Sequence, residues 1–176
     1  MERIGSRAVY EGKIARVRID EFRYRDGSTS EREVVGHPGA VAMLAVDERH
    51  LYLVRQPREA VDEEALLELP AGKLDVEGEE PLDCAKRELA EEIGKAASEW
   101  RELKRFYTSP GFAEEQVILY LAAGLDDVRA DPGEEERLEI VPWELDRLDA
   151  AIEECRDSKS LIGMLLLRDL RRAGAA

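Results

Sequence analysis

Three glutamates, Glu88, Glu91 and Glu92, are the residues of this sequence best placed to do chemistry together. On a helix, their offsets of three and four residues would put all three side chains on one face. Carboxylate oxygens are hard ligands, so such a cluster suits Mg²⁺ or Mn²⁺. The alternative is a solvated acidic face, because like-charged neighbours on an exposed helix cost only about 0.2–0.5 kcal/mol per pair. Taken alone, the cluster favours that plainer interpretation.

The residues around these acids predict the helix that would carry them, over positions 80–93. Pro81 suits the first helical position, and Gly94 suits the position just past the last turn. The apolar residues of the segment fall on a separate stripe at helical spacing: Leu82, Ala85, Leu89 and Ile93. One side of the helix is therefore expected to pack while the other presents carboxylates.

The stretch from Gly72 to Gly94 resembles the Nudix box, in which a Gly, a loop, a Glu and seven residues precede Arg-Glu-apolar-any-Glu-Glu-any-Gly. The spacing from Glu79 to Arg87 is that of the family, and every fixed position from Arg87 to Gly94 matches. One residue more than usual separates Gly72 from Glu79. It falls in the loop at 75–78, where an extra residue is most easily absorbed.

The resemblance implies a role for each fixed position. Glu88 and Glu92 would be the principal metal ligands, and Glu91 would share or tune a second metal during catalysis. The carbonyl of Ala71 would complete the site. The remaining positions would be structural, as turn residues or as an ion pair that holds the acids: Gly72, Glu79, Arg87 and Gly94.

A second informative segment is Ser-Pro-Gly-Phe-Ala-Glu-Glu at residues 109–115. Pro110 lies sixteen residues beyond Gly94, and a proline at that spacing is similar to the ADP-ribose pyrophosphatase branch of Nudix enzymes. The segments 55–58 and 67–72 also resemble that branch. Enzymes for other nucleoside diphosphate sugars share parts of the pattern.

In that branch the loop carries a glutamate that acts as general base, so the resemblance implies this role for Glu115, with Glu114 as the alternative. A pair of exposed loop acids is the plainer interpretation. Arginine suits a phosphate because its planar guanidinium donates two parallel hydrogen bonds. The residues expected to contact substrate are Arg55, Arg58, Pro110 and Gly111.

The activity that these features imply is metal-dependent cleavage of a pyrophosphate bond, with Mg²⁺ preferred and Mn²⁺ acceptable. ADP-ribose is the best single expectation for substrate, giving AMP and ribose 5-phosphate. The alternatives are another nucleoside diphosphate sugar such as GDP-mannose, an oxidised nucleoside triphosphate, or a non-catalytic domain that senses a nucleotide.

Strands and helices are mixed along the chain without regular alternation, which favours an α/β (α+β) layer fold. Strands are predicted within 8–36, 41–46, 51–54, 66–69, 101–108 and 116–122, and helices over 80–93, 144–155 and 158–173. The resemblance implies a Nudix-type mixed β-sheet sandwiched between helices. It also implies a small N-terminal antiparallel sheet (residues 1–36) that pairs two chains in a homodimer, beside a hydrolase domain (residues 37–176).

The composition limits the partners. A formal net charge of −14 argues against binding to nucleic acid or to an anionic membrane, because phosphates would be repelled. A small phosphorylated ligand stays compatible, since a bound cation reverses the local field. Cys84 and Cys155 are far apart, and no apolar stretch has the length of a signal peptide or membrane span. We therefore expect a cytoplasmic protein.

Overall fold

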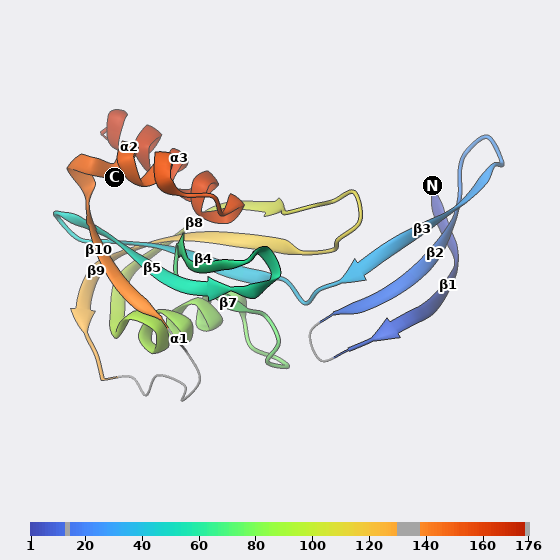
Figure 1. Cartoon of the computed structure of the whole chain (residues 1–176), viewed down its shortest axis with the longest axis horizontal. Helices are drawn as coiled ribbons and strands as arrows, with labels where there is room; N and C mark the ends of the chain where they lie inside the picture. Colours follow the sequence, from blue (N-terminus) through green and yellow to red (C-terminus); the bar gives the residue numbers. More distant parts are fainter. Residues whose placement is uncertain (13–14, 130–137, 175–176) are drawn as a thin grey trace.

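The computed structural model describes residues 1–12, 15–129 and 138–174 of the chain. Two sheets organise this part of the protein: a three-stranded antiparallel sheet near the N-terminus and a seven-stranded mixed sheet with helices on both faces (Figure 1). The expected fold class, a mixed sheet between helices with a small N-terminal antiparallel sheet, is confirmed.

The small sheet consists of β1 (Glu2–Glu11), β2 (Arg16–Arg23) and β3 (Thr29–Gly36), paired in that order. The turn between β2 and β3 uses Gly27 at a φ of 85°, as the Asp-Gly pair in the sequence predicts. β1 begins well before residue 8, where the sequence predicted the first strand. Nearly every side chain of β1 is exposed, so this strand lacks the alternation that identifies a half-buried one.

The large sheet has the order β10-β5-β4-β9-β8, with β6 beside β5 and β7 beside β4. β4 and β9 are parallel, whereas the other neighbours are antiparallel, including the β4–β5 pair that the sequence predicted. The strands span β4 (Ala40–Val46), β5 (His50–Arg58), β6 (Glu63–Glu68), β7 (Ala71–Lys73), β8 (Lys95–Tyr107), β9 (Gln116–Asp127) and β10 (Glu139–Glu144).

Helices cover both faces of this sheet. α1 (Pro81–Ile93) packs on one face, and α2 (Leu148–Glu154) and α3 (Ser158–Arg172) pack on the other (Figure 1). Short 3₁₀ turns precede β6 and α2: η1 (Glu59–Val61) and η2 (Leu145–Arg147). The helix predicted over 144–155 therefore begins as a 3₁₀ turn and becomes α-helical at Leu148.

β4 is the centre of the core because both of its faces are covered. Ala42 and Leu44 pack toward α2 and α3, whereas Val41 and Met43 pack toward α1. A strand buried on both faces needs no polar residues, which explains the continuous apolar run in the sequence.

The strand regions that the sequence analysis missed include β10 and the first half of β8. β10 carries Pro142 and acidic residues, and proline is tolerated there because β10 lies at the edge of the sheet. β8 begins at Lys95 rather than at 101, and its first half contains charged residues such as Glu99 that face solvent. Exposed polar strands give a weak signal, since burial is what produces alternation.

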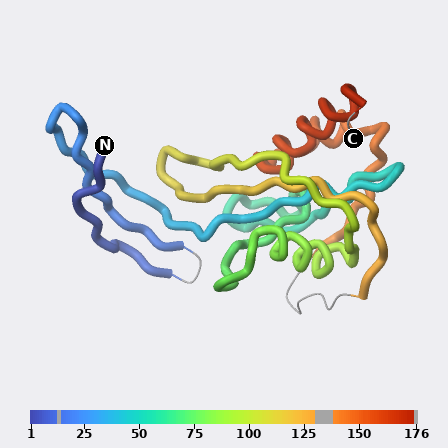
Figure 2. Tube along the Cα trace, turned by 180° about the vertical axis from the view of Figure 1, so that it is seen from behind, coloured from blue at the N-terminus to red at the C-terminus, as the bar shows by residue number. Residues whose placement is uncertain are grey.

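The loop between β8 and β9 projects from the body toward the small sheet (Figure 2). Its backbone joins β3 directly: the Val35 amide donates to the Phe112 carbonyl at 2.7 Å, and the Glu114 amide donates to the Val35 carbonyl at 3.0 Å. The N-terminal sheet and the loop at 109–115 therefore form one hydrogen-bonded unit.

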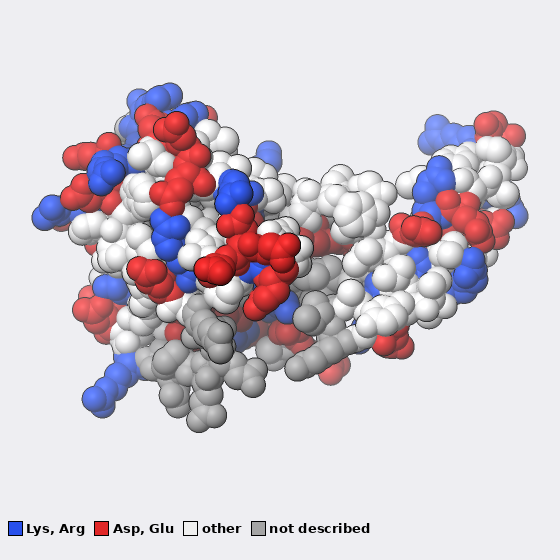
Figure 3. Space-filling view, viewed as in Figure 1, with Lys and Arg blue, Asp and Glu red and all other residues white. Residues whose placement is uncertain are grey.

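Acidic and basic side chains intermingle over the face shown in Figure 3, so the net negative charge is spread there rather than gathered in one patch. Among the helices in the described part of the chain, none has the length and apolar character needed to cross a bilayer.

Candidate active site

The acidic helix α1 begins and ends as its sequence predicts. Pro81 occupies the first turn, and Gly94 ends the helix in the left-handed conformation, where its amide bonds the Ala90 carbonyl. Gly72 on β7 lies directly against Glu88, because a Cβ built on this glycine would stand 2.1 Å from Glu88 Cγ. A side chain at position 72 would therefore push Glu88 out of place.

Arg87 joins three carboxylates at the surface of α1. Its guanidinium donates two hydrogen bonds of 2.9 Å to Glu79, and its Nη1 also donates to Glu88 at 2.8 Å and to Glu91 at 3.0 Å. The hydrogen bonds from Arg87 lower the pKa of Glu79, and those to Glu79 raise the pKa of Arg87. Both groups stay charged at neutral pH, so this ion pair orients the helix acids.

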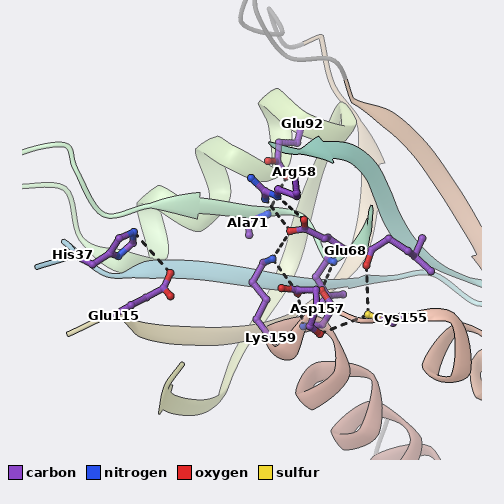
Figure 4. Close-up of polar contacts among 12 residues, drawn as sticks. His37, Arg58, Glu68, Ala71, Glu92, Glu115, Cys155, Asp157 and Lys159 are labelled. Atoms are coloured by element: carbon purple, nitrogen blue, oxygen red, sulfur yellow. Dashed lines mark hydrogen bonds and ion pairs between the residues drawn. The ribbon is translucent and has the colours of Figure 1, made fainter. Parts of the chain in front are cut away.

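Glu92 lies deeper, with 8% of its surface exposed. Its Oε2 accepts a hydrogen bond of 3.0 Å from the backbone amide of Ala71, at the start of β7 (Figure 4). The sequence analysis assigned a metal-binding role to the carbonyl of Ala71. The structure places that residue next to Glu92, so both lie at the same point of the site.

Opposite these acids, Glu68 is almost completely buried at 1% exposure, between two cations. Arg58 donates to it through Nε at 2.6 Å and Nη2 at 2.8 Å, and the Lys159 ammonium pairs with the same carboxylate (Figure 4). Burial alone would raise the pKa of Glu68, but the hydrogen bonds and charges of Arg58 and Lys159 outweigh it and lower the pKa. Arg58 is thus already bonded to a protein carboxylate.

The third side of the site is the loop at 109–115. Glu115 Oε2 accepts a hydrogen bond of 2.6 Å from the Thr108 hydroxyl, and its Oε1 lies 3.8 Å from His37 Nε2. Glu114 instead points to the small sheet, where Arg18 grips its carboxylate from two nitrogens. The hydrogen bonds from Arg18 lower the pKa of Glu114.

These three sides enclose a cavity of about 640 Å³, a size typical of sites for small organic ligands. The structure brings six of the residues that the sequence analysis selected to its wall: Arg58, Ala71, Gly72, Glu88, Glu92 and Glu115. Acids, cations and a candidate base thus face one space from separate elements.

Other selected residues lie elsewhere. Arg55 pairs with Glu154 of α2 and lines a separate hollow on the surface. Pro110 and Gly111 are exposed on their loop. Glu91 is not among the described residues that line the cavity, and Arg87 holds it on the helix surface.

A model of the NUDIX domain matches residues 36–160, which include α1, β7 and the loop that carries Glu115. The chain belongs to the Nudix family. It is therefore a Nudix hydrolase of the pyrophosphatase kind, as the resemblance of the box implied.

Relatives of this Nudix hydrolase match over most of its length. It is 38% identical to the methanol dehydrogenase activator of Bacillus methanolicus, over 94% of this chain and 91% of that protein. It is 40% identical to the ADP-ribose pyrophosphatase of Bacillus subtilis (strain 168), over 78% of this chain and 75% of the relative. The crystal structure of an ADP compounds hydrolase superposes with a TM-score of 0.85 at 21% identity, covering 99% and 96% of the two chains, which establishes the shared fold.

The donor set of this Nudix hydrolase fits a divalent metal ion that takes only part of its ligands from the protein. Among the described residues, no three acidic, histidine or cysteine side chains already converge on one point. Mg²⁺ commonly binds through one or two carboxylates together with waters and substrate phosphates rather than in an all-protein cage. Glu88 and Glu92 line the cavity wall and supply such a partial set.

The sequence analysis missed several residues of the site. His37 lies in the Gly-His-Pro-Gly break before β4, and Thr108 directly follows β8, next to the loop at 109–115. Lys159 stands in the first turn of α3, and Glu68 precedes the Pro-Ala-Gly segment. The glycines and prolines flanking His37 were a usable signal for a special turn. For Lys159 the sequence offered none, because only the packing of α3 brings it to Glu68.

Proposed function

We propose that this Nudix hydrolase cleaves ADP-ribose to AMP and ribose 5-phosphate in a Mg²⁺-dependent reaction. The observation that carries the proposal is the cavity itself, in which Glu88 and Glu92 face the Arg58–Glu68–Lys159 cluster and Glu115 closes the third side. The similarity to an ADP-ribose pyrophosphatase over most of the chain supports this substrate over other nucleoside diphosphate compounds.

In this proposal Glu88 and Glu92 hold the metal. When bound, the divalent cation neutralises charge on the pyrophosphate oxygens and so reduces repulsion of an incoming nucleophile. Arg87 orients Glu88 and Glu91 through charge-assisted hydrogen bonds. Arg58 keeps its contact with Glu68 and presents the remaining edge of its guanidinium, which is 43% exposed at the side chain, to a phosphate.

Glu115 acts as the general base. It takes a proton from a water molecule, whose oxygen attacks one phosphorus in line with the bridging oxygen. The bond from that phosphorus to the bridging oxygen breaks, and the two monophosphates leave. Glu114 is the weaker candidate because Arg18 already binds its carboxylate and turns it toward the small sheet.

The test is a screen of nucleoside diphosphate compounds with Mg²⁺, in which the products are separated by chromatography. We expect ADP-ribose to yield equimolar AMP and ribose 5-phosphate. Faster turnover of GDP-mannose would assign the enzyme to another sugar nucleotide. Release of inorganic pyrophosphate from a triphosphate would contradict the proposed bond cleavage, and tight ADP-ribose binding without turnover would indicate a sensor domain.

We extend the proposal to assembly: residues 1–36 form a subdomain that pairs two chains in a homodimer, beside a hydrolase domain at 37–176. The small sheet stands apart from the body in Figure 1, and its strand β1 exposes Val9 and Tyr10 at 55% and 60%. Exposed apolar side chains on a three-stranded sheet favour a partner surface. A sedimentation mass of one chain at micromolar concentration would contradict the dimer.

A second candidate is activation of a methanol dehydrogenase, because the relative of that name matches 94% of this chain. A methanol dehydrogenase assay with and without this protein tests it, and no change in rate would rule it out. In either case we place the enzyme in the cytoplasm. Cys84 and Cys155 are both buried and free, the state that a reducing compartment maintains.

A further inference from the structure

His37 lies in the short connection between the small sheet and β4, and both of its ring nitrogens have defined surroundings. The backbone amide of Gly39 donates a hydrogen bond of 3.1 Å to Nδ1. A nitrogen that accepts a hydrogen bond carries no proton of its own, so the proton of the neutral ring is on Nε2.

The protonated Nε2 faces the loop acid. It lies 3.8 Å from Oε1 of Glu115 (Figure 4). The Thr108 hydroxyl donates to the other oxygen, Oε2, at 2.6 Å. The side chains of His37 and Glu115 are 20% and 32% exposed, so both retain access to the cavity that they line. The two oxygens of Glu115 thus face donors from two separate segments, the Thr108 hydroxyl and the Nε2–H of His37.

We propose that His37 is a positioning residue for Glu115. Its Nε2–H restrains Oε1 while Thr108 restrains Oε2, so that the carboxylate is presented to the attacking water in one orientation. This inference rests on the proposed role of Glu115 as general base. A hydrogen bond of about 2.9 Å requires Glu115 to approach by about 1 Å, and catalytic contacts commonly tighten in this way when substrate binds.

The same geometry argues against His37 as the base itself. Abstraction of a proton needs a free lone pair, but the lone pair of Nδ1 is engaged by Gly39 and Nε2 carries hydrogen. His37 therefore acts through Glu115, and its loss is expected to lower kcat while leaving KM largely unchanged.

Two substitutions separate the roles of the two nitrogens. In His37→Asn the side-chain oxygen can still accept from the amide two residues ahead, a bond that asparagine commonly forms in turns, but the donor toward Glu115 is lost. In His37→Gln the longer side chain carries an amide donor out to the position of Nε2. The other histidine, His50, pairs with Asp47 outside the cavity, so His50→Asn is the matched control.

We expect His37→Asn to lower kcat for ADP-ribose about ten- to a hundredfold, the scale of misplacing a catalytic group, with KM within twofold. His37→Gln is expected to recover most of that loss, and His50→Asn to leave kcat unchanged. A rise in KM at constant kcat for His37→Asn would assign His37 to substrate binding and overturn the proposal. A loss in His37→Gln with none in His37→Asn would also overturn it, because the turn bond to Gly39 would then be what matters.

Glu115→Gln distinguishes this failure from failure of the proposed function. If Glu115→Gln loses activity while both His37 variants keep it, Glu115 is the base and His37 does not position it. If Glu115→Gln keeps full activity, the assigned base is wrong and the inference about His37 falls with it. Melting temperatures of all variants, measured by circular dichroism, identify any loss that comes from unfolding.

Discussion

The acids of α1 and the acids of the loop at 109–115 are held by contacts of very different range. On α1, Glu88 accepts a hydrogen bond from the adjacent Arg87 and lies against Gly72, and Glu92 accepts one from Ala71, about twenty positions upstream. On the loop, Glu114 is gripped by Arg18, a residue 96 positions away, and Glu115 faces His37.

The difference follows from the backbone. A helix holds side chains three and four residues apart on one face by its own hydrogen bonds, so the acids need few distant partners. The loop at 109–115 has turn hydrogen bonds of its own, and Thr108 at its base binds Glu115, but Glu114 is oriented by Arg18 of the small sheet. The acids of α1 are therefore held mainly by nearby segments, whereas the loop acids also contact the small sheet and its connection to β4.

The largest effect is expected for Glu92→Gln, which tests the metal role of the acids on α1. The neutral amide can still accept from the Ala71 amide, so the fold is expected to persist while metal affinity is lost. We expect Mg²⁺-dependent activity to fall about a thousandfold or more, because a catalytic metal supplies several kcal/mol of transition-state stabilisation. Activity assays across Mg²⁺ concentrations check this. Asp83→Asn, at an exposed position of the same helix, is the control, and wild-type activity of Glu92→Gln would refute the metal role.

On the loop, Glu115→Gln and Glu114→Gln separate the two neighbouring acids. We expect Glu115→Gln to lower kcat about a hundredfold, at the lower end of general-base contributions. Glu114→Gln keeps a hydrogen-bonding group for Arg18 and is expected to cost much less. Steady-state kinetics on both variants checks which loss of kcat is larger. A larger loss in Glu114→Gln would assign the base to Glu114.

Arg18→Ala tests whether the small sheet controls the loop from a distance. Arg18 also donates a hydrogen bond of 2.9 Å to Asp20, a residue whose side chain is 1% exposed. Removing Arg18 therefore leaves a buried carboxylate with fewer partners. We expect a destabilisation of about 2 kcal/mol from that partly unsatisfied charge and a fall in kcat of about tenfold from the released loop. Urea unfolding measures the change in stability, and steady-state kinetics measures the change in kcat. If neither changes, the loop at 109–115 keeps its conformation without Arg18.

The smallest expected effect is the pH dependence of the stability that the Arg18–Glu114 ion pair contributes. The hydrogen bonds from Arg18 lower the pKa of Glu114 below the usual 4.5. Its stabilising contribution is therefore complete above pH 4.5 and is lost as the pH falls through the lower folded-state pKa. The unfolding free energy of Glu114→Gln is expected to change less steeply than that of the wild type between pH 5 and pH 3. Parallel curves would show that the ion pair contributes nothing to stability.

The sequence predicted the bounds of α1 and the candidate metal ligands on it. The bounds of α1 followed from Pro81, Gly94 and a helical apolar stripe, and the box spacing identified Glu88 and Glu92. The helix bounds depend on terminal residues and on a stripe of helical period, where local geometry decides the structure. The selection of Glu88 and Glu92 came from the resemblance of the whole stretch from Gly72 to Gly94 to the Nudix box. The choice between a mixed and a regularly alternating sheet also followed from the order of strands and helices along the chain.

Only the tertiary structure decided which distant residues meet. It brought Lys159 and Arg58 to the buried Glu68 and paired Arg55 with Glu154 of α2. It also placed Arg18 beside Glu114 and His37 beside Glu115. No local pattern encodes these contacts, because they arise when the β-sheet closes and α3 packs on it. The sequence by itself thus determined the helix that carries the acids, and the packing of separate elements determined the cavity that those acids face.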